Sequence, residues 1–112
     1  MRLPDPEPKR VFICSRYVGD IERNVRIAIA LCRMAIEAGY APFAPHLIYT
    51  RLFDDNVPHE RKKGIALGLI YMNICDEVWV YTVDGISEGM KEEISHALML
   101  GKPIVEIQEV RL

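Results

Sequence analysis

Short apolar runs alternate with longer segments of helical periodicity along this chain. The runs that predict strands lie at residues 11–14, 40–44, 77–82 and 103–107. Helical periodicity between them predicts helices at about residues 21–38, 58–72 and 88–100. Asp20 and Ser87 are suited to cap two of these helices, and Gly101 is expected to end the last one in a left-handed conformation.

Strands that alternate with helices predict right-handed crossovers and a parallel sheet with helices on both faces. We therefore expect a flavodoxin- or Rossmann-like three-layer α/β sandwich of about four strands in the order 2-1-3-4. Pro42 favours an edge position for the second strand. The whole chain, residues 1–112, is predicted to be one domain, with residues 1–10 as a loose lead-in because they carry three prolines.

The first predicted helix has a face rich in branched apolar side chains, which we expect to pack on the sheet. This face comprises Ile21, Val25, Ala28, Ile29, Cys32 and Ile36.

An acidic residue falls on the apolar face of the last predicted helix. At about 100° per residue, Glu93 lies in the same arc as Met90, Ile94 and Ala97, and Leu98 and Leu100 lie at its margins. A buried carboxylate is usually paired, protonated or directed into a cavity. Glu93 is therefore the strongest candidate for a functional residue, with the alternative that its carboxylate reaches water at the margin of that face.

In the predicted strand order, the chain reverses direction between strands 1 and 3, and ligands of such sheets bind at that point. The loops that meet there are residues 15–20 and 84–89, so Glu93 would face the same crevice. In the first loop, Arg16 can bind an anion in front of a helix N-terminus, or the loop is an ordinary polar turn. In the second, Asp84 orients a ligand hydroxyl or forms a turn with Gly85, and Ser87 caps the helix.

Two further residues lie at or just after the ends of predicted strands. Cys14 is either a nucleophile or a small buried residue, and no histidine partner is evident for it. His46 has either a ligand-binding or a structural role. The three histidines show no metal-ligand spacing and the loop at 15–20 lacks the GxGxxG pattern, so we expect no metal and no cofactor.

Composition narrows the function classes. The formal net charge of −2 argues against a nucleic-acid polymer as partner. Three cysteines without a CxxC pair favour reduced thiols in the cytoplasm. No apolar run reaches the length of a membrane span, so no membrane partner is expected.

The sequence resembles the nucleoside 2-deoxyribosyltransferase-like superfamily, in particular a short branch of it. The similarity is carried by DGISEGMKEEISHA at residues 84–97, LGKPI at 100–104, ICSRY at 13–17 and APHL at 44–47. Two positions differ from the usual pattern, Met90 in place of Ser or Thr and Ser95 in place of Gly, and a further upstream acid of the family has no clear match here.

The resemblance implies N-glycosidase or deoxyribosyltransferase activity on a nucleoside or nucleoside 5′-monophosphate, or a sensing module that binds such a ligand without cleaving it. Glu93 would be the nucleophile that forms a glycosyl-enzyme intermediate, and Asp84 would lie near the sugar or base. The resemblance also implies a homodimer or higher homo-oligomer. The residues expected to bind substrate are Cys14, Ser15, Arg16, Tyr17, Gly19, His46, Ser87, Gly89 and Met90.

Overall fold

The computed structural model describes residues 6–112 and contains a parallel four-stranded sheet in the order β2-β1-β3-β4. The strands are β1 (Arg10–Cys14), β2 (Ala41–Phe43), β3 (Glu77–Tyr81) and β4 (Ile104–Ile107). The helices are α1 (Ile21–Glu37), α2 (Pro58–Met72) and α3 (Glu88–Leu100). The predicted α/β fold and strand order are confirmed, and β2, which carries Pro42, is an edge strand. Of the predicted lead-in, residues 1–5 lie outside the described residues, and residues 6–9 form no helix or strand.

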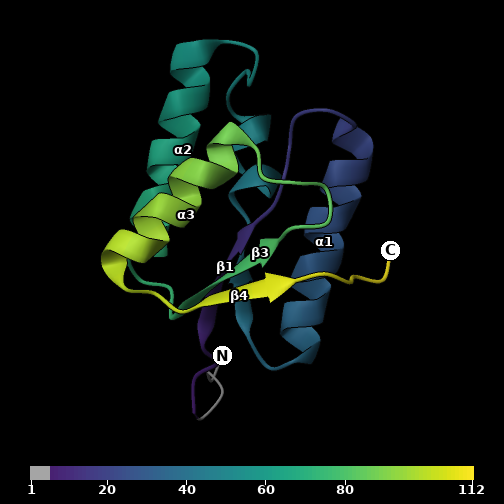
Figure 1. Ribbon diagram of the computed structural model, residues 1–112, viewed down its shortest axis with the longest axis vertical. Coiled ribbons are helices and arrows are strands. Elements are labelled where there is room, and N and C mark those ends of the chain that lie inside the picture. The colour runs from purple at the N-terminus through teal and green to yellow at the C-terminus, as the bar shows by residue number, and fades with distance from the viewer. Residues whose placement is uncertain (1–5) are drawn as a thin grey trace.

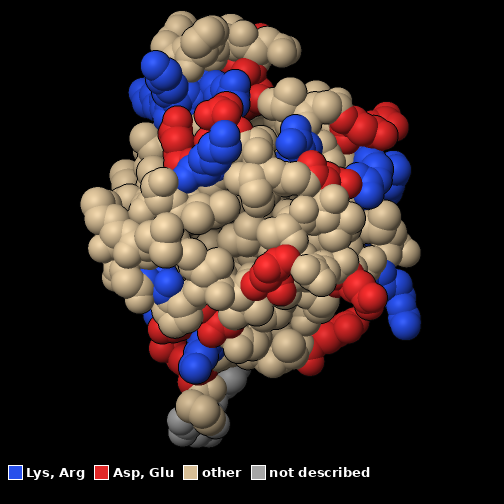
Figure 2. Space-filling model, viewed as in Figure 1, with Lys and Arg blue, Asp and Glu red and all other residues tan. Residues whose placement is uncertain are grey.

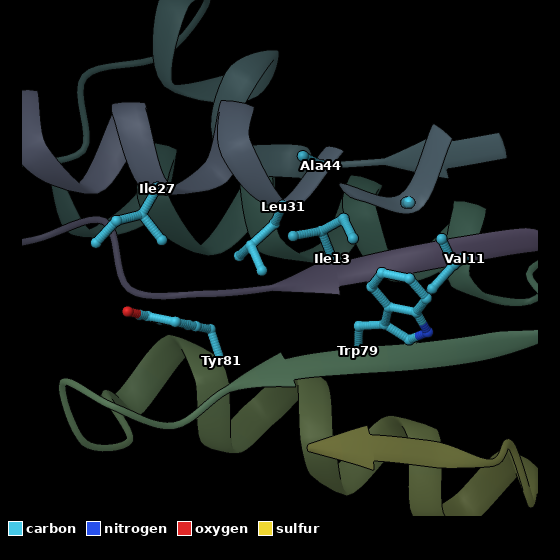
Figure 3. Packing of buried hydrophobic residues seen from close by; sticks show 8 residues of the cluster. Val11, Ile13, Ile27, Leu31, Ala44, Trp79 and Tyr81 are labelled. Carbon is cyan, nitrogen blue, oxygen red and sulfur yellow. The ribbon is translucent and has the colours of Figure 1, made fainter. Parts of the chain in front are cut away.

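The helices cover both faces of the sheet, with α1 on one face and α2 and α3 on the other (Figure 1). Side chains of successive strand residues point to opposite faces, so β1 and β3 contribute to two separate hydrophobic cores. The first core joins α1 to the sheet through Val11, Ile13, Ile27, Leu31, Ala35, Ala44, Trp79 and Tyr81 (Figure 3). The second joins α2 and α3 to the sheet through Phe12, Cys14, Met72, Cys75, Val78, Val80, Met90 and Ala97.

The predicted apolar face of α1 is only partly right. Ala28 is buried and Cys32 packs against the first core, but Ile21, Ile29 and Ile36 are exposed. The buried side also includes Ile27, Leu31 and Ala35. The helix carries apolar residues over more than half of its circumference, so periodicity alone did not identify the packed side. The buried side is the one with smaller side chains, because Ala28 and Ala35 allow the helix to approach the sheet closely.

Helix α3 begins and ends as its sequence predicts. The backbone N–H of Met90 donates to the Ser87 hydroxyl at 3.2 Å, and Gly101 ends the helix at φ +68°. The buried face is narrower than expected, since it comprises Met90, Glu93 and Ala97 while Leu98 and Leu100 are exposed.

The segment between β2 and α2 contains two single-turn 3₁₀ helices, η1 (Pro45–Leu47) and η2 (Tyr49–Arg51). It packs closely on α2 because α2 has glycines at the contact. A Cβ added to Gly68 would lie 3.2 Å from the Cβ of Pro45, and one added to Gly64 would lie 3.4 Å from the Cβ of Tyr49. These glycines allow the segment to lie directly against α2.

Basic and acidic side chains are interspersed on the face shown in Figure 2, and few charges lie across its middle. Within residues 6–112, no helix is both long enough and apolar enough to span a membrane.

Candidate functional site

Glu93 lies in the second turn of α3 and is 2% exposed, as its position on the helical wheel predicted. Its Oε1 atom has no hydrogen-bond partner among the described residues. Burial raises the pKa of Glu93 to about 8, a donated hydrogen bond from the Cys14 thiol lowers it, and the nearby Glu92 adds to the increase. A carboxyl group that is buried with an unpartnered oxygen is costly for folding, which is typical of a functional group.

Cys14 ends β1 beside Glu93 and is fully buried. Its Sγ lies 3.9 Å from the Met90 carbonyl oxygen, and the Glu93 carboxylate is a second acceptor within reach. Burial and the adjacent carboxylate raise the pKa of the Cys14 thiol well above its usual value. The thiol therefore remains protonated, which is unsuited to a nucleophile and suited to a hydrogen-bond donor.

A small cavity adjoins Glu93, between α3, α2 and the segment that follows β2. Its volume of about 30 Å³ is enough for about one water molecule. The lining residues are Pro45, His46, Tyr49, Thr50, Phe53, Asp55, Glu60, Arg61, Gly64, Ile65 and Glu93. Sequence reasoning identified His46 and Glu93 among them but none of the other polar ones. The sequence signal for Tyr49, Thr50 and Asp55 was the length of the irregular segment at residues 45–57, and Glu60 and Arg61 belong to the first turn of α2.

Two further buried polar atoms without partners lie in the loop after β1. Ser15 is 1% exposed and its Oγ forms no hydrogen bond within the described part of the chain. The same holds for the buried Nε atom of Arg16. The Arg16 side chain extends toward the loop after β3, because a Cβ added to Gly85 would lie 3.7 Å from its Nη2. The structure thus brings the two predicted loops together and leaves hydrogen-bonding groups unused between them.

The first loop is held in place by Asn24 of α1, a buried residue that sequence reasoning missed. Its side-chain amide donates to the carbonyl oxygens of Tyr17 at 2.9 Å and Val18 at 3.3 Å. Asn24 belongs to the face of α1 that packs on the sheet, so a correct assignment of that face would have shown it to be buried. Gly19 has φ +113°, a conformation that other residues rarely adopt, and allows the loop to turn into α1.

Tyr17 of the loop after β1 packs against His46 of η1, with their ring centroids 5.5 Å apart. The His46 ring also hydrogen-bonds to the Ser15 backbone, and its burial lowers the pKa of the imidazole. His46 is therefore neutral near pH 7, in contact with the loop after β1 and on the wall of the cavity at Glu93.

Asp84, at the start of the loop after β3, is paired with Arg23 of α1. Its Oδ2 accepts a hydrogen bond from Nη1 of Arg23 at 2.7 Å. Asp84 is not among the described residues that line the cavity at Glu93. Ser87 caps α3 as predicted, and Gly89 lies against α2, since a Cβ added there would be 3.6 Å from Cδ1 of Ile65.

Comparison with known proteins identifies the family. The family model described as "Domain of unknown function (DUF7768)" matches residues 9–107. A sequence comparison with curated proteins gives no significant match.

Three solved structures are similar in fold. A 2-deoxyribosyltransferase from Bacillus psychrosaccharolyticus is 14% identical with a TM-score of 0.69, over 87% of this chain and 70% of that one. A 2-deoxyribosyltransferase from Leishmania mexicana is 17% identical with a TM-score of 0.58, over 89% and 64% of the two chains. The CMP N-glycosidase BcmB from Clostridium botulinum is 21% identical with a TM-score of 0.52, over 88% and 67%. This chain therefore spans about two thirds of the length of these enzymes.

From the match over residues 9–107 and the shared strand order, we conclude that the chain belongs to the DUF7768 family and has a nucleoside 2-deoxyribosyltransferase-like fold.

Proposed function

We propose that this protein cleaves the N-glycosidic bond of a nucleoside or nucleoside 5′-monophosphate, with Glu93 as the nucleophile. The observation that carries the proposal is the buried Glu93 carboxyl group with one unpartnered oxygen, next to the carboxyl end of β1. The fold supports it, because the similar solved structures are two 2-deoxyribosyltransferases and a CMP N-glycosidase.

In the proposed reaction, the Glu93 carboxylate attacks the anomeric carbon of the sugar. The bond between that carbon and the base nitrogen breaks, and its electron pair leaves with the base, which takes up a proton. The product is a glycosyl ester on Glu93, and the positive charge that develops on the sugar is stabilised by the carboxylate. A dry environment strengthens this electrostatic stabilisation.

The resting enzyme holds Glu93 largely protonated, because its pKa is about 8. Attack therefore requires the ionised minority, about one molecule in ten at pH 7. The Cys14 thiol favours that form because it donates a hydrogen bond to the carboxylate. The unpartnered Ser15 Oγ and Arg16 Nε are then available for the sugar, the base or a 5′-phosphate, and Asp84 is within the adjoining loop.

The test is release of free base from a panel of deoxynucleosides and their 5′-monophosphates, measured by chromatography. We compare wild type with Glu93→Gln, which keeps the shape of the side chain but removes the nucleophile. Glu92→Gln is the matched control, because Glu92 is the neighbouring acid on the exposed side of α3. We expect wild type and Glu92→Gln to release base and Glu93→Gln to lose at least about 1,000-fold of the rate. Absence of base release from every substrate by wild type would overturn the proposal.

A second candidate function, binding of a nucleotide without cleavage, is favoured by the protonation state of Glu93. Its pKa of about 8 leaves the carboxyl group mostly uncharged at neutral pH, and an uncharged carboxyl group can donate a hydrogen bond to a ligand but is a poor nucleophile. A nucleotide that raises the melting temperature of wild type without any release of base would support this function instead.

A further inference from the structure

His46 and Glu93 line the same cavity although they come from opposite sides of it. His46 lies in η1, directly after β2, and Glu93 lies in α3. The cavity between them has the volume of about one water molecule. A buried water needs two or more polar partners, and the unpartnered Oε1 of Glu93 supplies one.

The surroundings of His46 favour one arrangement of its ring. The Ser15 backbone raises the pKa of the imidazole, which is the effect of a carbonyl that accepts from a ring N–H. The second ring nitrogen of the neutral imidazole is then an acceptor. The position of the residue is also fixed, because the Thr50 hydroxyl donates to the His46 carbonyl oxygen at 2.6 Å and the Tyr17 ring packs on the imidazole at 5.5 Å.

The surroundings keep His46 in its basic form. Burial is the largest influence on the pKa of His46 and lowers it. Among the charged groups near the ring, Asp55 raises this pKa and Arg61 lowers it, and Glu60 and Glu93 share the cavity wall. An oriented, neutral imidazole beside a water-sized space has the requirements of a general base.

We propose that His46 is the general base that activates water against the glycosyl-enzyme intermediate on Glu93, so that the reaction is hydrolysis rather than transfer to a second base. This inference rests on the proposed function. The water oxygen attacks the anomeric carbon, and the free ring nitrogen of His46 takes one proton of the water. The bond from that carbon to the Glu93 oxygen breaks, and its electron pair restores the carboxylate. The proton on His46 passes to solvent, and the sugar leaves with the hydroxyl group.

The experiment separates the two chemical steps with His46→Gln. Glutamine keeps a side-chain N–H for the Ser15 carbonyl but cannot accept the proton of water. The matched control is His59→Gln, because His59 is exposed on α2 and is not among the described residues at the cavity. Base release is followed from the first turnover onward, and the intact mass of the protein is measured during the reaction.

We expect His46→Gln to release about one equivalent of base rapidly, at a rate within about three-fold of wild type, and then to slow by about 100-fold or more in steady state. The protein should gain the mass of one glycosyl group, and this adduct should be absent when Glu93→Gln is added to the same variant. His59→Gln should match wild type in both phases.

Several outcomes overturn the inference. If His46→Gln slows the first turnover and the steady state equally, or accumulates no adduct, His46 does not act on water. If wild type releases base but incorporates added labelled free base into nucleoside faster than it hydrolyses, water is not the acceptor, and this measurement needs no variant. His46→Asn is tested alongside in case His46→Gln fails to fold. If wild type releases no base at all, the proposed function itself fails, and this inference fails with it.

Discussion

Arg23 of α1 holds Asp84 of the loop after β3, with 2.7 Å between its Nη1 and the Oδ2 of the carboxylate. The pair joins a helix on one face of the sheet to the loop that leads into α3 on the other. It also raises the pKa of Arg23, first through the hydrogen bond and then through the negative charge. Any chemical role of Asp84 therefore has to be separated from its role in anchoring this loop.

Substitution of each partner makes that separation. Both side chains are partly exposed, so Arg23→Gln should lower the melting temperature only slightly, and the effect should shrink further in high salt. If Asp84 contacts the substrate, Asp84→Asn should reduce kcat/KM by at least about 10-fold more than Arg23→Gln does. Arg26→Gln, at an exposed position of α1, is the control. Equal losses for Arg23→Gln and Asp84→Asn would assign Asp84 a purely structural role.

The buried carboxyl group makes the stability of the protein depend on pH. The pKa of Glu93 is about 8 in the folded state against 4.5 for an ordinary glutamate, so the folded state binds the proton more tightly. Its stabilising contribution is complete below about pH 4.5 and is lost as the pH rises through about 8, at up to about 1.4 kcal/mol per pH unit. Glu93→Gln should remove this loss. Urea unfolding from pH 5 to 9 measures it, and Glu22→Gln, at an exposed position of α1, should retain the wild-type slope.

The same group sets the expected pH dependence of activity. Because the nucleophile has to be ionised, kcat/KM should rise with pH up to about 8 and level off above it. The measurement is kcat/KM for one active substrate from pH 6 to 9.5. A profile that is already flat at pH 6 would mean that Glu93 is not the nucleophile, or that its carboxylate is stabilised by a group absent from the contacts described above.

Cys14 should determine the pH at which kcat/KM rises. Its thiol donates to the Glu93 carboxylate and lowers the pKa of Glu93, so removal of the donor should move the rising limb to higher pH. Cys14→Ala tests this, and Cys14→Ser, whose hydroxyl is a stronger donor, should move the limb the other way. Cys75→Ala is the control, because Cys75 is a buried thiol of the same hydrophobic core that donates to the Tyr71 carbonyl. Identical limbs for the two Cys14 variants would contradict the contact.

The glycines of α2 should differ in their response to alanine. Alanine favours a helix over glycine by up to about 1 kcal/mol, and the Cβ at position 64 meets only an ordinary contact at 3.4 Å. The Cβ at position 68 approaches the Cβ of Pro45 to 3.2 Å, and the proline ring cannot turn away. We expect Gly64→Ala to be neutral or stabilising and Gly68→Ala to be less stable than it by about 1–2 kcal/mol in urea unfolding. Equal free energies of unfolding for the two variants would mean that Pro45 and its neighbours move away from an added Cβ at position 68 without loss of stability.

The sequence predicted the architecture well because its signals were local and redundant. Apolar runs marked all four strands, and Asp20, Ser87 and Gly101 marked the ends of helices. The inward position of Glu93 followed from helical geometry alone. The packed face of α1 did not follow, because Ile21, Ile29 and Ile36 form a second apolar stripe that periodicity cannot distinguish from the buried one.

The candidate site was predictable only in part. Cys14, Ser15 and Glu93 could be brought together from the strand order, because they lie at or face the carboxyl end of β1. Thr50 and Asp55 could not, since an irregular segment has no period from which the direction of its side chains can be read. The contact of this segment with α2 depends on Gly64 and Gly68, whose role becomes visible only when the two elements are placed together.

The central position of β1 also determines when this protein can fold. The backbone N–H of Arg10 donates to the Asp76 carboxylate 66 residues further along the chain, and β1 then runs beside β3 as far as Val80. During synthesis on the ribosome, the edge of β1 that pairs with β3 therefore stays unpaired until β3 has left the exit tunnel. Pairing over such a separation is slow, so the time between synthesis of β1 and β3 is when the nascent chain is most exposed to misassociation and to chaperones.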